Sequence, residues 1–236
     1  MSFASQYSVV VPAAGIGKRM KSACPKQYLT ISGKTIIEHT LSQLLSHSQI
    51  QRVIVVLNPE DHQFATLPIA SHPSIEVVEG GQERSDSVLA GLNYLSDEEW
   101  VLVHDAARPC ITKTDITALL QLAERDSNGG ILATPVRDTM KRAFDVDPHH
   151  TPLIRHTESR ENLWHALTPQ FFKLPLLKKA LNQAMIEKVA ITDEASAIEL
   201  LGEEVCLVQG SPSNIKVTQP DDLLLAEFYL TQQQTK

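Results

Sequence analysis

The sequence predicts an α/β fold with a mostly parallel sheet and helices on both of its faces. Short runs rich in β-branched residues recur along the 236-residue chain, as expected for buried strands. Segments with the apolar spacing of an amphipathic helix lie between several of these runs. A strand followed by a helix, repeated along a chain, is typical of a parallel sheet, because the crossover connections lay helices against both faces.

The expected strands are short β-branched runs, which we interpret as buried strands. They lie at Tyr7–Val11, Arg52–Leu57, Ile75–Val78, Trp100–His104, Gly130–Thr134, Val205–Val208 and Ile215–Val217. We therefore expect one central sheet built from segments along the whole chain.

Two apolar stripes with i, i+4, i+7 spacing predict helices between the strands. They consist of Ile37, Leu41, Leu44 and Leu45, and of Val88, Leu92 and Leu95. A last helix should begin near Pro220, because the missing N–H of proline is not needed in a first turn. Thr192 is interpreted as a helix N-cap, since acidic residues then occupy the first turn, where negative charge is favourable.

Residues 137–160 break the alternation of strands and helices, because they contain no helical stripe. Two extended runs, Thr139–Phe144 and Pro152–Glu158, flank a turn-like segment, so we expect a projecting β-hairpin. A two-stranded ribbon alone is marginally stable in water and needs a partner surface, for which a second subunit is the natural candidate. A loose surface excursion is the alternative interpretation.

Length and composition favour a single soluble domain over residues 1–236. The 21 Lys and Arg against 28 Asp and Glu give a formal net charge of -7, which disfavours binding to nucleic acid or to an anionic membrane. The three cysteines form no C-x-x-C, which argues against a zinc ribbon and a disulfide framework. No stretch approaches the roughly 20 apolar residues of a membrane span. We therefore expect a cytoplasmic protein.

A loop of small residues follows the first expected strand, and basic residues follow the loop. Gly15 and Gly17 would let backbone N–H groups approach an anion closely. Met20 stands at the third glycine position of a dinucleotide-binding G-x-G-x-x-G, and no G-K-[ST] completes a P-loop, which disfavours a dehydrogenase and an ordinary NTPase. Lys18, Arg19 and Lys26, three cations within nine residues, supply the positive charge that a triphosphate needs. A tight turn with solvated basic residues is the alternative.

Asp105 and Arg108 follow an apolar strand that ends abruptly in charge. Ligands of open α/β sheets bind beyond the carboxyl ends of the strands, so both residues are placed for a site. A hard carboxylate there suits Mg²⁺, which proteins commonly bind with one or two carboxylates and with substrate phosphates. Mn²⁺ or another divalent ion would also fit. The simpler interpretation is an Asp that caps a turn and an Arg that pairs with it.

Lys216 lies between apolar residues of a short expected strand, so its side chain should point to the opposite face. By itself it would be an ordinary edge-strand lysine. None of the nine histidines stands in an H-x-x-x-H or similar ligand spacing, so we assign no zinc. Without a G-x-S-x-G elbow or a cysteine in a nucleophile context, covalent catalysis lacks support.

Eight blocks of the sequence form a set: Val11–Met20, Cys24–Tyr28, Gly80–Ser87, His104–Pro109, Pro135–Lys141, Leu163–Gln170, Thr192–Ser196 and Asn214–Thr218. Together they resemble the 2-C-methyl-D-erythritol 4-phosphate cytidylyltransferases of the non-mevalonate isoprenoid pathway. The first two blocks are shared with sugar nucleotidyltransferases generally, whereas the others are much narrower. The resemblance runs almost from end to end.

The resemblance implies a Rossmann-like sheet and a β-arm at residues 137–160 that joins two subunits into a homodimer with shared active sites. The implied reaction transfers CMP from CTP to 2-C-methyl-D-erythritol 4-phosphate, with Mg²⁺, and yields 4-diphosphocytidyl-2-C-methyl-D-erythritol and pyrophosphate. On matching positions it implies catalytic roles for Arg19, Lys26 and Lys216, nucleotide binding by Ala13, Ala14, Gly15, Gly17, Gly81, Gln82, Ser87, Asp105 and Ala106, a metal-linked carboxylate at Asp105, and substrate binding by Arg108, Thr139, Arg160, Thr168 and Thr192. Thr139 and Arg160 would reach from the partner's arm.

Two positions depart from the family's pattern. Gln82 lies where a short acidic residue is also familiar, and Ser85 lies where glutamine is frequent. The first matters little if cytosine is read there through backbone groups. The nearest alternative is a ribitol 5-phosphate cytidylyltransferase, with the same phosphate chemistry and another polyol. A catalytically silent nucleotide-binding or scaffold protein is the alternative from another class, because a fold does not fix a function.

Overall fold

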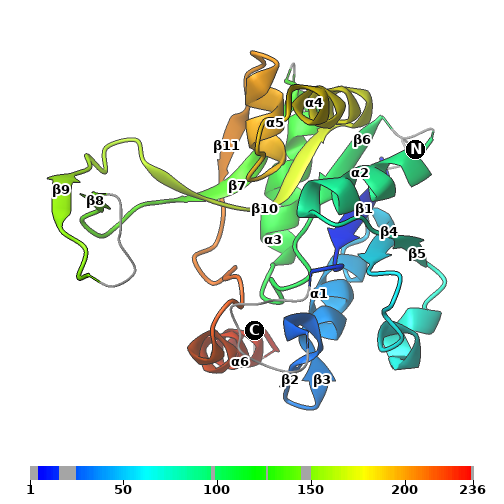
Figure 1. Ribbon diagram of the computed structural model, residues 1–236. Helices are drawn as coiled ribbons and strands as arrows, with labels where there is room; N and C mark the ends of the chain where they lie inside the picture. Colours follow the sequence, from blue (N-terminus) through cyan, green and yellow to red (C-terminus); the bar gives the residue numbers. More distant parts are fainter. Residues whose placement is uncertain (1–4, 16–24, 97–98, 126, 145–149, 235–236) are drawn as a thin grey trace.

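A seven-stranded sheet forms the centre of the protein, whose computed structural model describes residues 5–15, 25–96, 99–125, 127–144 and 150–234 (Figure 1). Its strand order is β11-β7-β10-β6-β1-β4-β5. The strands are β1 (Tyr7–Pro12), β4 (Ile50–Leu57), β5 (Ile75–Glu79), β6 (Trp100–Val103), β7 (Gly129–Pro135), β10 (Trp164–Lys173) and β11 (Cys206–Gln209). Only β10 runs antiparallel to its neighbours, β6 and β7, so the prediction of a mostly parallel sheet is confirmed.

Helices cover both faces of this sheet, as predicted (Figure 1). The helices are α1 (Ile36–Leu45), α2 (Arg84–Tyr94), α3 (Lys113–Leu120), α4 (Leu174–Glu187), α5 (Glu194–Leu200) and α6 (Pro220–Gln234). On β1, Val9 and Val11 pack into a cluster with residues of α1 and α3, whereas Val10 packs into a second cluster with residues of α2, α4 and α5. This alternation is the reason that the strands read as continuous apolar runs.

Short elements complete the fold. They are the 3-10 helices η2 (Lys26–Tyr28), η3 (Phe64–Thr66), η4 (Pro68–Ser71) and η5 (Gln121–Glu124), and the small ladder of β2 (Thr30–Ile31) with β3 (Lys34–Thr35). The short helix η2 lies directly after the glycine-containing loop that follows β1, and it places Lys26 at the carboxyl edge of the sheet.

Helix α2 lies unusually close to the sheet, because Gly91 faces it. A Cβ atom at this position would stand 2.6 Å from a methyl carbon of Val10 and 2.9 Å from one of Val56. These separations are shorter than carbon atoms tolerate, so glycine permits the close approach. The contact fixes α2 on β1 and β4, and thereby fixes the position of Arg84 at its first turn.

Two local expectations were wrong. Residues 215–217 do not form a strand: the Val217 N–H donates to Ala107 O over 2.8 Å, and the segment contacts the loop after β6 instead of entering a sheet. The N-cap of α5 is Asp193 rather than Thr192, because the Asp193 carboxylate accepts from the Ser196 N–H and the Ser196 hydroxyl lies against the Asp193 backbone N–H.

The hairpin expected within residues 137–160 is present as a separate two-stranded sheet of β8 (Lys141–Ala143) and β9 (Ile154–Thr157). Figure 1 shows that it projects well away from the main sheet. Phe144 and Leu153 at its outer end are 55% and 72% exposed, and Ile154 is 63% exposed. Apolar side chains in such a position suit a contact with another surface. That this surface belongs to a second subunit stays a prediction.

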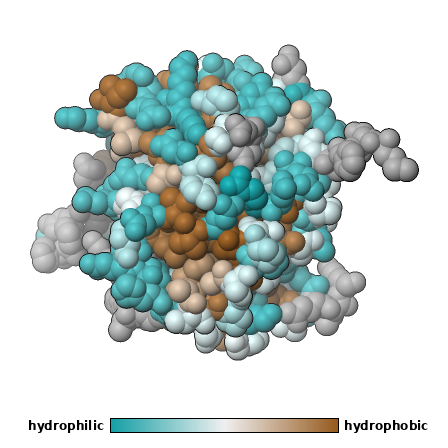
Figure 2. Space-filling model, turned by 90° about the vertical axis from the view of Figure 1, so that its right-hand side faces the viewer, coloured by the Kyte–Doolittle hydropathy of each residue, from teal (hydrophilic) through white to brown (hydrophobic). Residues whose placement is uncertain are grey.

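Figure 2 views the side of the molecule on which β5 forms the edge of the sheet, and shows apolar atoms near the middle of a mostly hydrophilic face. Val77 of β5 is 52% exposed. By itself this group of apolar atoms identifies no binding site, because apolar atoms contribute much of the surface of any folded protein. Among the helices described, none combines the length and apolarity needed to cross a membrane.

Candidate active site

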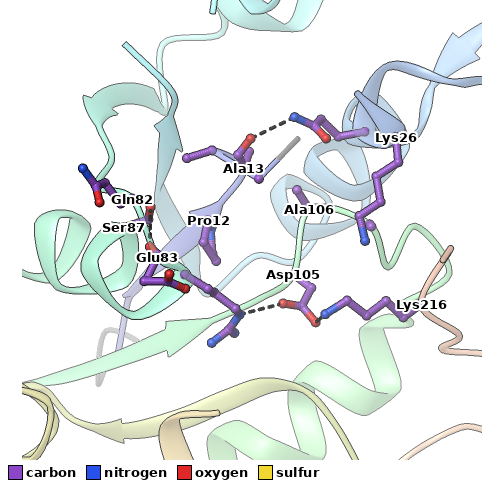
Figure 3. Close-up of a pocket in the computed structure, with 15 residues that line it drawn as sticks. Pro12, Ala13, Lys26, Gln82, Glu83, Ser87, Asp105, Ala106 and Lys216 are labelled. Atoms are coloured by element: carbon purple, nitrogen blue, oxygen red, sulfur yellow. Dashed lines mark hydrogen bonds and ion pairs between the residues drawn. The ribbon is translucent and has the colours of Figure 1, made fainter. Parts of the chain in front are cut away.

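A pocket of about 150 Å³ opens at the carboxyl ends of β1 and β6, where the loops after these strands meet the turn before α2 (Figure 3). It collects most of the residues that the sequence analysis assigned to the nucleotide. These are Ala13, Ala14, Gly15, Lys26, Gly81, Gln82, Ser87, Asp105, Ala106 and Lys216. The position at the carboxyl edge of a mostly parallel sheet is the one at which open α/β sheets bind ligands.

A second pocket, of about 210 Å³, lies next to the first. Its lining contains Arg108, Thr168 and Thr192, three of the residues predicted to bind the polyol phosphate. Thr168 comes from β10 and Thr192 from the loop before α5. Three residues belong to the linings of both pockets, namely Arg84, Asp105 and Lys216. These three residues therefore form a wall between the two pockets, the shared wall.

The shared wall is held together by ion pairs that centre on Asp105. Its Oδ2 lies 2.8 Å from Lys216 Nζ and 3.4 Å from Arg108 Nε, and its Oδ1 accepts from Arg84 Nε over 3.2 Å (Figure 3). Burial alone would raise the pKa of the Asp105 carboxyl, but the charges of Arg84, Lys216 and Arg108 outweigh it and hold this pKa well below its usual range. Asp105 is therefore a buried anion among three cations.

The small-residue loop and the turn before α2 are shaped by close contacts. Gln27 Nε2 donates to Ala13 O over 2.9 Å and holds the loop after β1. A Cβ atom at Gly81 would lie 2.4 Å from the Cβ atom of Asp86, so glycine is needed for the turn to approach the first turn of α2. Lys26 Nζ donates to Val217 O over 3.3 Å, which ties the loop region to the segment that carries Lys216.

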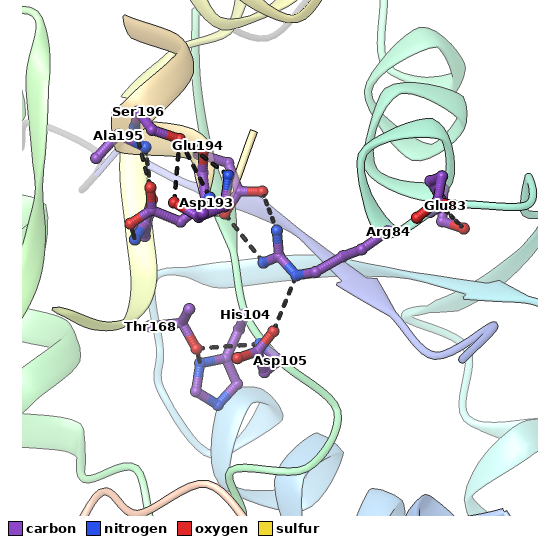
Figure 4. A network of polar contacts seen from close by, with 12 residues as sticks. Glu83, Arg84, His104, Asp105, Thr168, Asp193, Glu194, Ala195 and Ser196 are labelled. Atoms are coloured by element: carbon purple, nitrogen blue, oxygen red, sulfur yellow. Dashed lines mark hydrogen bonds and ion pairs between the residues drawn. The ribbon is translucent and has the colours of Figure 1, made fainter. Parts of the chain in front are cut away.

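His104 connects the loop after β6 to β10 through hydrogen bonds whose directions can be assigned (Figure 4). Its Nε2 lies 3.1 Å from Arg108 O, a carbonyl that can only accept, so Nε2 carries the proton. Burial lowers the pKa of His104 to about 4, so the ring is neutral near pH 7 and Nδ1 is an acceptor. The Thr168 hydroxyl, 3.0 Å away, donates to Nδ1 and accepts from the Asp105 N–H over 3.1 Å.

Arg84 links two helix ends across the shared wall (Figure 4). Its Nη1 and Nη2 donate to the two carboxylate oxygens of Glu194 over 2.6 Å and 3.1 Å. Burial by itself would lower the pKa of the Arg84 guanidinium, but the carboxylates of Glu194 and Asp105 raise it above its ordinary value. Gln170 on β10 holds the same end of α5, since its amide donates to Asp193 Oδ2 and accepts from the Ala195 N–H.

Four predicted site residues do not contribute to these pockets in the described part of the chain. Gly17 and Arg19 lie outside the described residues. Thr139 and Arg160 belong to residues 137–160, where both are exposed, and neither lines either of the two pockets described above. Arg160 Nη1 donates to Arg137 O within this segment. That these two residues contact a substrate stays a prediction.

The sequence matches the family described as IspD: 2-C-methyl-D-erythritol 4-phosphate cytidylyltransferase over residues 7–232. The 2-C-methyl-D-erythritol 4-phosphate cytidylyltransferase of Pseudoalteromonas atlantica is 60% identical over 235 residues, with 100% of both chains covered. The chain belongs to this cytidylyltransferase family.

Solved structures agree with this membership of the cytidylyltransferase family. A crystal structure of a 4-diphosphocytidyl-2C-methyl-D-erythritol synthase superimposes with a TM-score of 0.80 at 36% identity, and covers 97% of this chain and 100% of its own. The Francisella tularensis 2-C-methyl-D-erythritol 4-phosphate cytidylyltransferase gives a TM-score of 0.79 at 34% identity, with 95% and 100% covered. The resemblance inferred from eight sequence blocks is confirmed.

Asp105 is the residue that fits the divalent ion implied by the family. Among the residues that the structure describes, no three His, Cys, Asp or Glu side chains gather to hold a metal. A single hard carboxylate in the wall shared by the two pockets nevertheless suits Mg²⁺, an ion that keeps several waters and that proteins commonly hold with one or two carboxylates and substrate phosphates. The donor set is therefore compatible with Mg²⁺ and unsuited to zinc.

The sequence analysis missed Arg84, Glu194 and Gln170. Arg84 and Glu194 stand within blocks that carried the resemblance, but neither received a role. Glu194 was interpreted only as a favourable charge in the first turn of a helix. The missing signal was the pairing across 110 residues of sequence, which no local pattern contains.

The buried neutral His104 predicts a pH dependence of stability. The unfolded chain binds a proton on this ring near pH 6.5, whereas the folded chain binds it only near pH 4. Stability should therefore be full above pH 6.5 and fall as the pH drops towards 4, by up to about 3 kcal/mol from this group. Urea unfolding between pH 4.5 and 7.5 should show a steeper loss for the wild type than for His104→Gln. Parallel pH profiles would contradict the assignment.

Proposed function

We propose that this chain transfers CMP from CTP to 2-C-methyl-D-erythritol 4-phosphate and releases pyrophosphate. Membership of the cytidylyltransferase family supports the reaction. The observation that carries the proposal is the pair of neighbouring pockets with a shared wall of Arg84, Asp105 and Lys216. A transfer between two phosphate compounds needs such an arrangement, because both must meet at one point within a charged environment.

In this proposal, CTP occupies the pocket lined by the loop after β1 and by the turn before α2. Lys26 and Lys216 contact its phosphates together with Arg19, while Gly81, Gln82 and Ser87 surround the cytosine. The chain as a whole has a net charge of -7 and does not attract anions. A triphosphate must therefore be bound by a local cluster of cations, and these lysines and Arg19 supply one. The remaining small residues of the lining, Ala13, Ala14, Gly15 and Ala106, allow close approach of the nucleotide. We assign the same role to Gly17, which lies outside the described residues.

The polyol phosphate occupies the second pocket, near Arg108, Thr168 and Thr192. Its phosphate oxygen attacks the α-phosphorus of CTP in line, and the bond from this phosphorus to the oxygen that bridges to the β-phosphate breaks as pyrophosphate leaves. The attacking oxygen is already anionic near neutral pH, so the reaction requires no general base. Fixed cations lower the barrier by positioning two polyanions and by stabilising the charge that builds on their oxygens.

A divalent ion, Mg²⁺ or a similar cation, would be held by Asp105 and by substrate phosphates, and when bound it supplies neutralising charge at the phosphates. Hydrogen bonds of His104 and Thr168 fix the backbone of the loop after β6. They thereby orient the Asp105 carboxylate towards the position proposed for the ion. Thr168 Oγ1 accepts from the Asp105 N–H, so the wall of the polyol pocket and the metal-linked carboxylate are held by one network.

The functional unit in this proposal is a cytoplasmic homodimer in which the whole chain is one nucleotidyltransferase domain. Its arm, residues 137–160, would lie on the partner subunit and bring Thr139 and Arg160 to the partner's polyol pocket. Two features support the arrangement. The arm carries large exposed apolar side chains, including Phe144 and Leu153, and Thr139 and Arg160 line neither pocket formed with the rest of their own chain.

A comparison of two polyol phosphates tests the reaction. Pyrophosphate release should be measured with CTP and Mg²⁺, using 2-C-methyl-D-erythritol 4-phosphate and ribitol 5-phosphate side by side. We expect strong preference for the first. Lys26→Ala should lower the rate by about 10²–10³ or more, as for the removal of other groups that stabilise developing negative charge.

Preference for ribitol 5-phosphate would keep the phosphate chemistry and overturn the proposed substrate. Binding of CTP without release of pyrophosphate from either polyol would indicate a silent nucleotide-binding protein. A near-normal rate for Lys26→Ala would contradict the role given to this lysine.

The shared site can be tested by mixing subunits. Lys26→Ala and Arg160→Ala proteins should each be nearly inactive as homodimers. After subunit exchange, mixed dimers should regain activity, because one of their two sites combines the intact residues of both chains. Exchange can be followed with differently labelled subunits, and absence of recovery despite exchange would contradict a site completed by the partner's arm.

A further inference from the structure

We propose that the Arg84–Glu194 ion pair is a positioning element that couples the nucleotide pocket to the polyol phosphate pocket. The inference rests on the proposed function and adds a role for two residues to which neither the sequence pattern nor the family resemblance gave one. Arg84 is the first residue of α2, and Glu194 is the first residue of α5. The pair therefore joins the start of α2, whose preceding turn lines the nucleotide pocket, to the start of α5, whose preceding loop lines the polyol phosphate pocket.

The geometry uses every donor nitrogen of the guanidinium. Nη1 and Nη2 of Arg84 engage both carboxylate oxygens of Glu194, and Nε engages Asp105 Oδ1 (Figure 4). The planar guanidinium thus makes two hydrogen bonds to one carboxylate and a third to another carboxylate. A group held in this way has little freedom to rotate. Arg84 thus fixes the distance and angle between Glu194 and Asp105.

Burial makes this pair sensitive to the loss of one partner. Glu194 is only 1% exposed, so its carboxylate has little access to water. The two bonds from Arg84 supply the opposite charge that a buried carboxylate requires. Without Arg84, the start of α5 would have to move towards solvent to hydrate this carboxylate. Such a movement changes the loop that carries Thr192 and Asp193.

The two ends of the pair are joined along the chain to different ligand environments. Arg84 lines both pockets, and the residues just before it, Gly81 to Glu83, line the nucleotide pocket. On the other side, Thr192 and Asp193 directly precede Glu194 and line the polyol phosphate pocket. Rigid elements joined by a fixed contact can carry a change at one site to the other. Binding of a ligand that orders one pocket should therefore raise the affinity of the other pocket for its own ligand.

Glu194 provides a clean probe, because it is absent from the linings of both pockets. In this proposal, an effect of Glu194 on the affinity for CTP travels through Arg84. Glu194→Gln keeps the volume of the side chain and its position in α5, and it removes the charge that holds the guanidinium. The expected result is an affinity for CTP about tenfold weaker, measured by calorimetric titration of CTP and Mg²⁺ without the polyol phosphate.

Arg84→Met should show the same loss of CTP affinity, and both variants should also raise the KM for the polyol phosphate by about tenfold. The double variant should be no weaker than Arg84→Met alone, because both changes remove one interaction. Arg84→Lys should fall between the wild type and Arg84→Met, since an ammonium group keeps the charge and cannot form the two-bond fork.

A second Arg–Glu pair, which lies in the central sheet and is more exposed, serves as a control for the loss of an ion pair outside the pockets. Arg52 Nε lies 2.8 Å from Glu76 Oε1 on β4 and β5, and neither residue lines either pocket. Arg52→Met and Glu76→Gln remove the same kind of interaction and should leave the CTP affinity and both KM values unchanged. Thermal unfolding of all variants reports whether each one is folded.

Unchanged CTP affinity in a folded Glu194→Gln protein would overturn the proposal, as would equal losses in the Arg52 and Glu76 controls. Additive losses in the double variant would also overturn it, because the two residues would then act independently. These outcomes are separable from failure of the proposed function, which would show as absence of pyrophosphate release by the wild type with either polyol phosphate.

Discussion

The structure around the site depends on the charge of one buried carboxylate. Asp105 lies beyond the end of β6 and contacts Arg84, Arg108 and Lys216, which come from three separate segments. Without the carboxylate, three cations would face one another at short range in a partly buried region, which is strongly unfavourable. The opposite charge of Asp105 therefore lets these segments converge. The same convergence creates the wall that the two pockets share.

The packing of β1, β6 and β10 determines where the Asp105 carboxylate lies. Apolar residues on both faces of β1 and β6 hold the strands in the core, and the chain can expose polar groups only where the strands end. The antiparallel strand β10 then passes beside β6 and brings Thr168 against the Asp105 N–H. Because His104 accepts from Thr168 and donates to Arg108 O, the loop is fixed at both of its ends. Binding and packing thus use the same residues.

Sequence patterns predicted the parts of this structure that depend on local periodicity. The runs at Tyr7–Val11 and Ile75–Val78 became β1 and β5, because β-branched residues favour strand structure in a central position such as that of β1 and also at the sheet edge, where β5 lies. Strand β10 was not expected, since Pro169 and several polar residues interrupt it, and its pairing with β7 shifts register between Ala166 and Gln170. The strand expected at residues 215–217 did not form for a different reason. A short apolar run also occurs in irregular segments that long-range hydrogen bonds hold in place, as the bond from the Val217 N–H to Ala107 O does here.

For the candidate site, the strand-end position of Asp105 and the cations near the first loop could be inferred from residue types. The family resemblance assigned the other residues. Neither source revealed that Arg84 and Glu194 meet, because each residue has a sufficient local explanation at a helix start. Long-range ion pairs of this kind depend on how α2 and α5 pack on one face of the sheet, which the chain's local patterns do not specify.

The most direct test of the central role of Asp105 is the rate of pyrophosphate release by Asp105→Asn, a change that keeps the side-chain volume and removes the charge. If this carboxylate organises the shared wall and holds the divalent ion, the rate with CTP, Mg²⁺ and 2-C-methyl-D-erythritol 4-phosphate should fall by at least about 10² in a protein that remains folded. A folded Asp105→Asn protein with a near wild-type rate would contradict it.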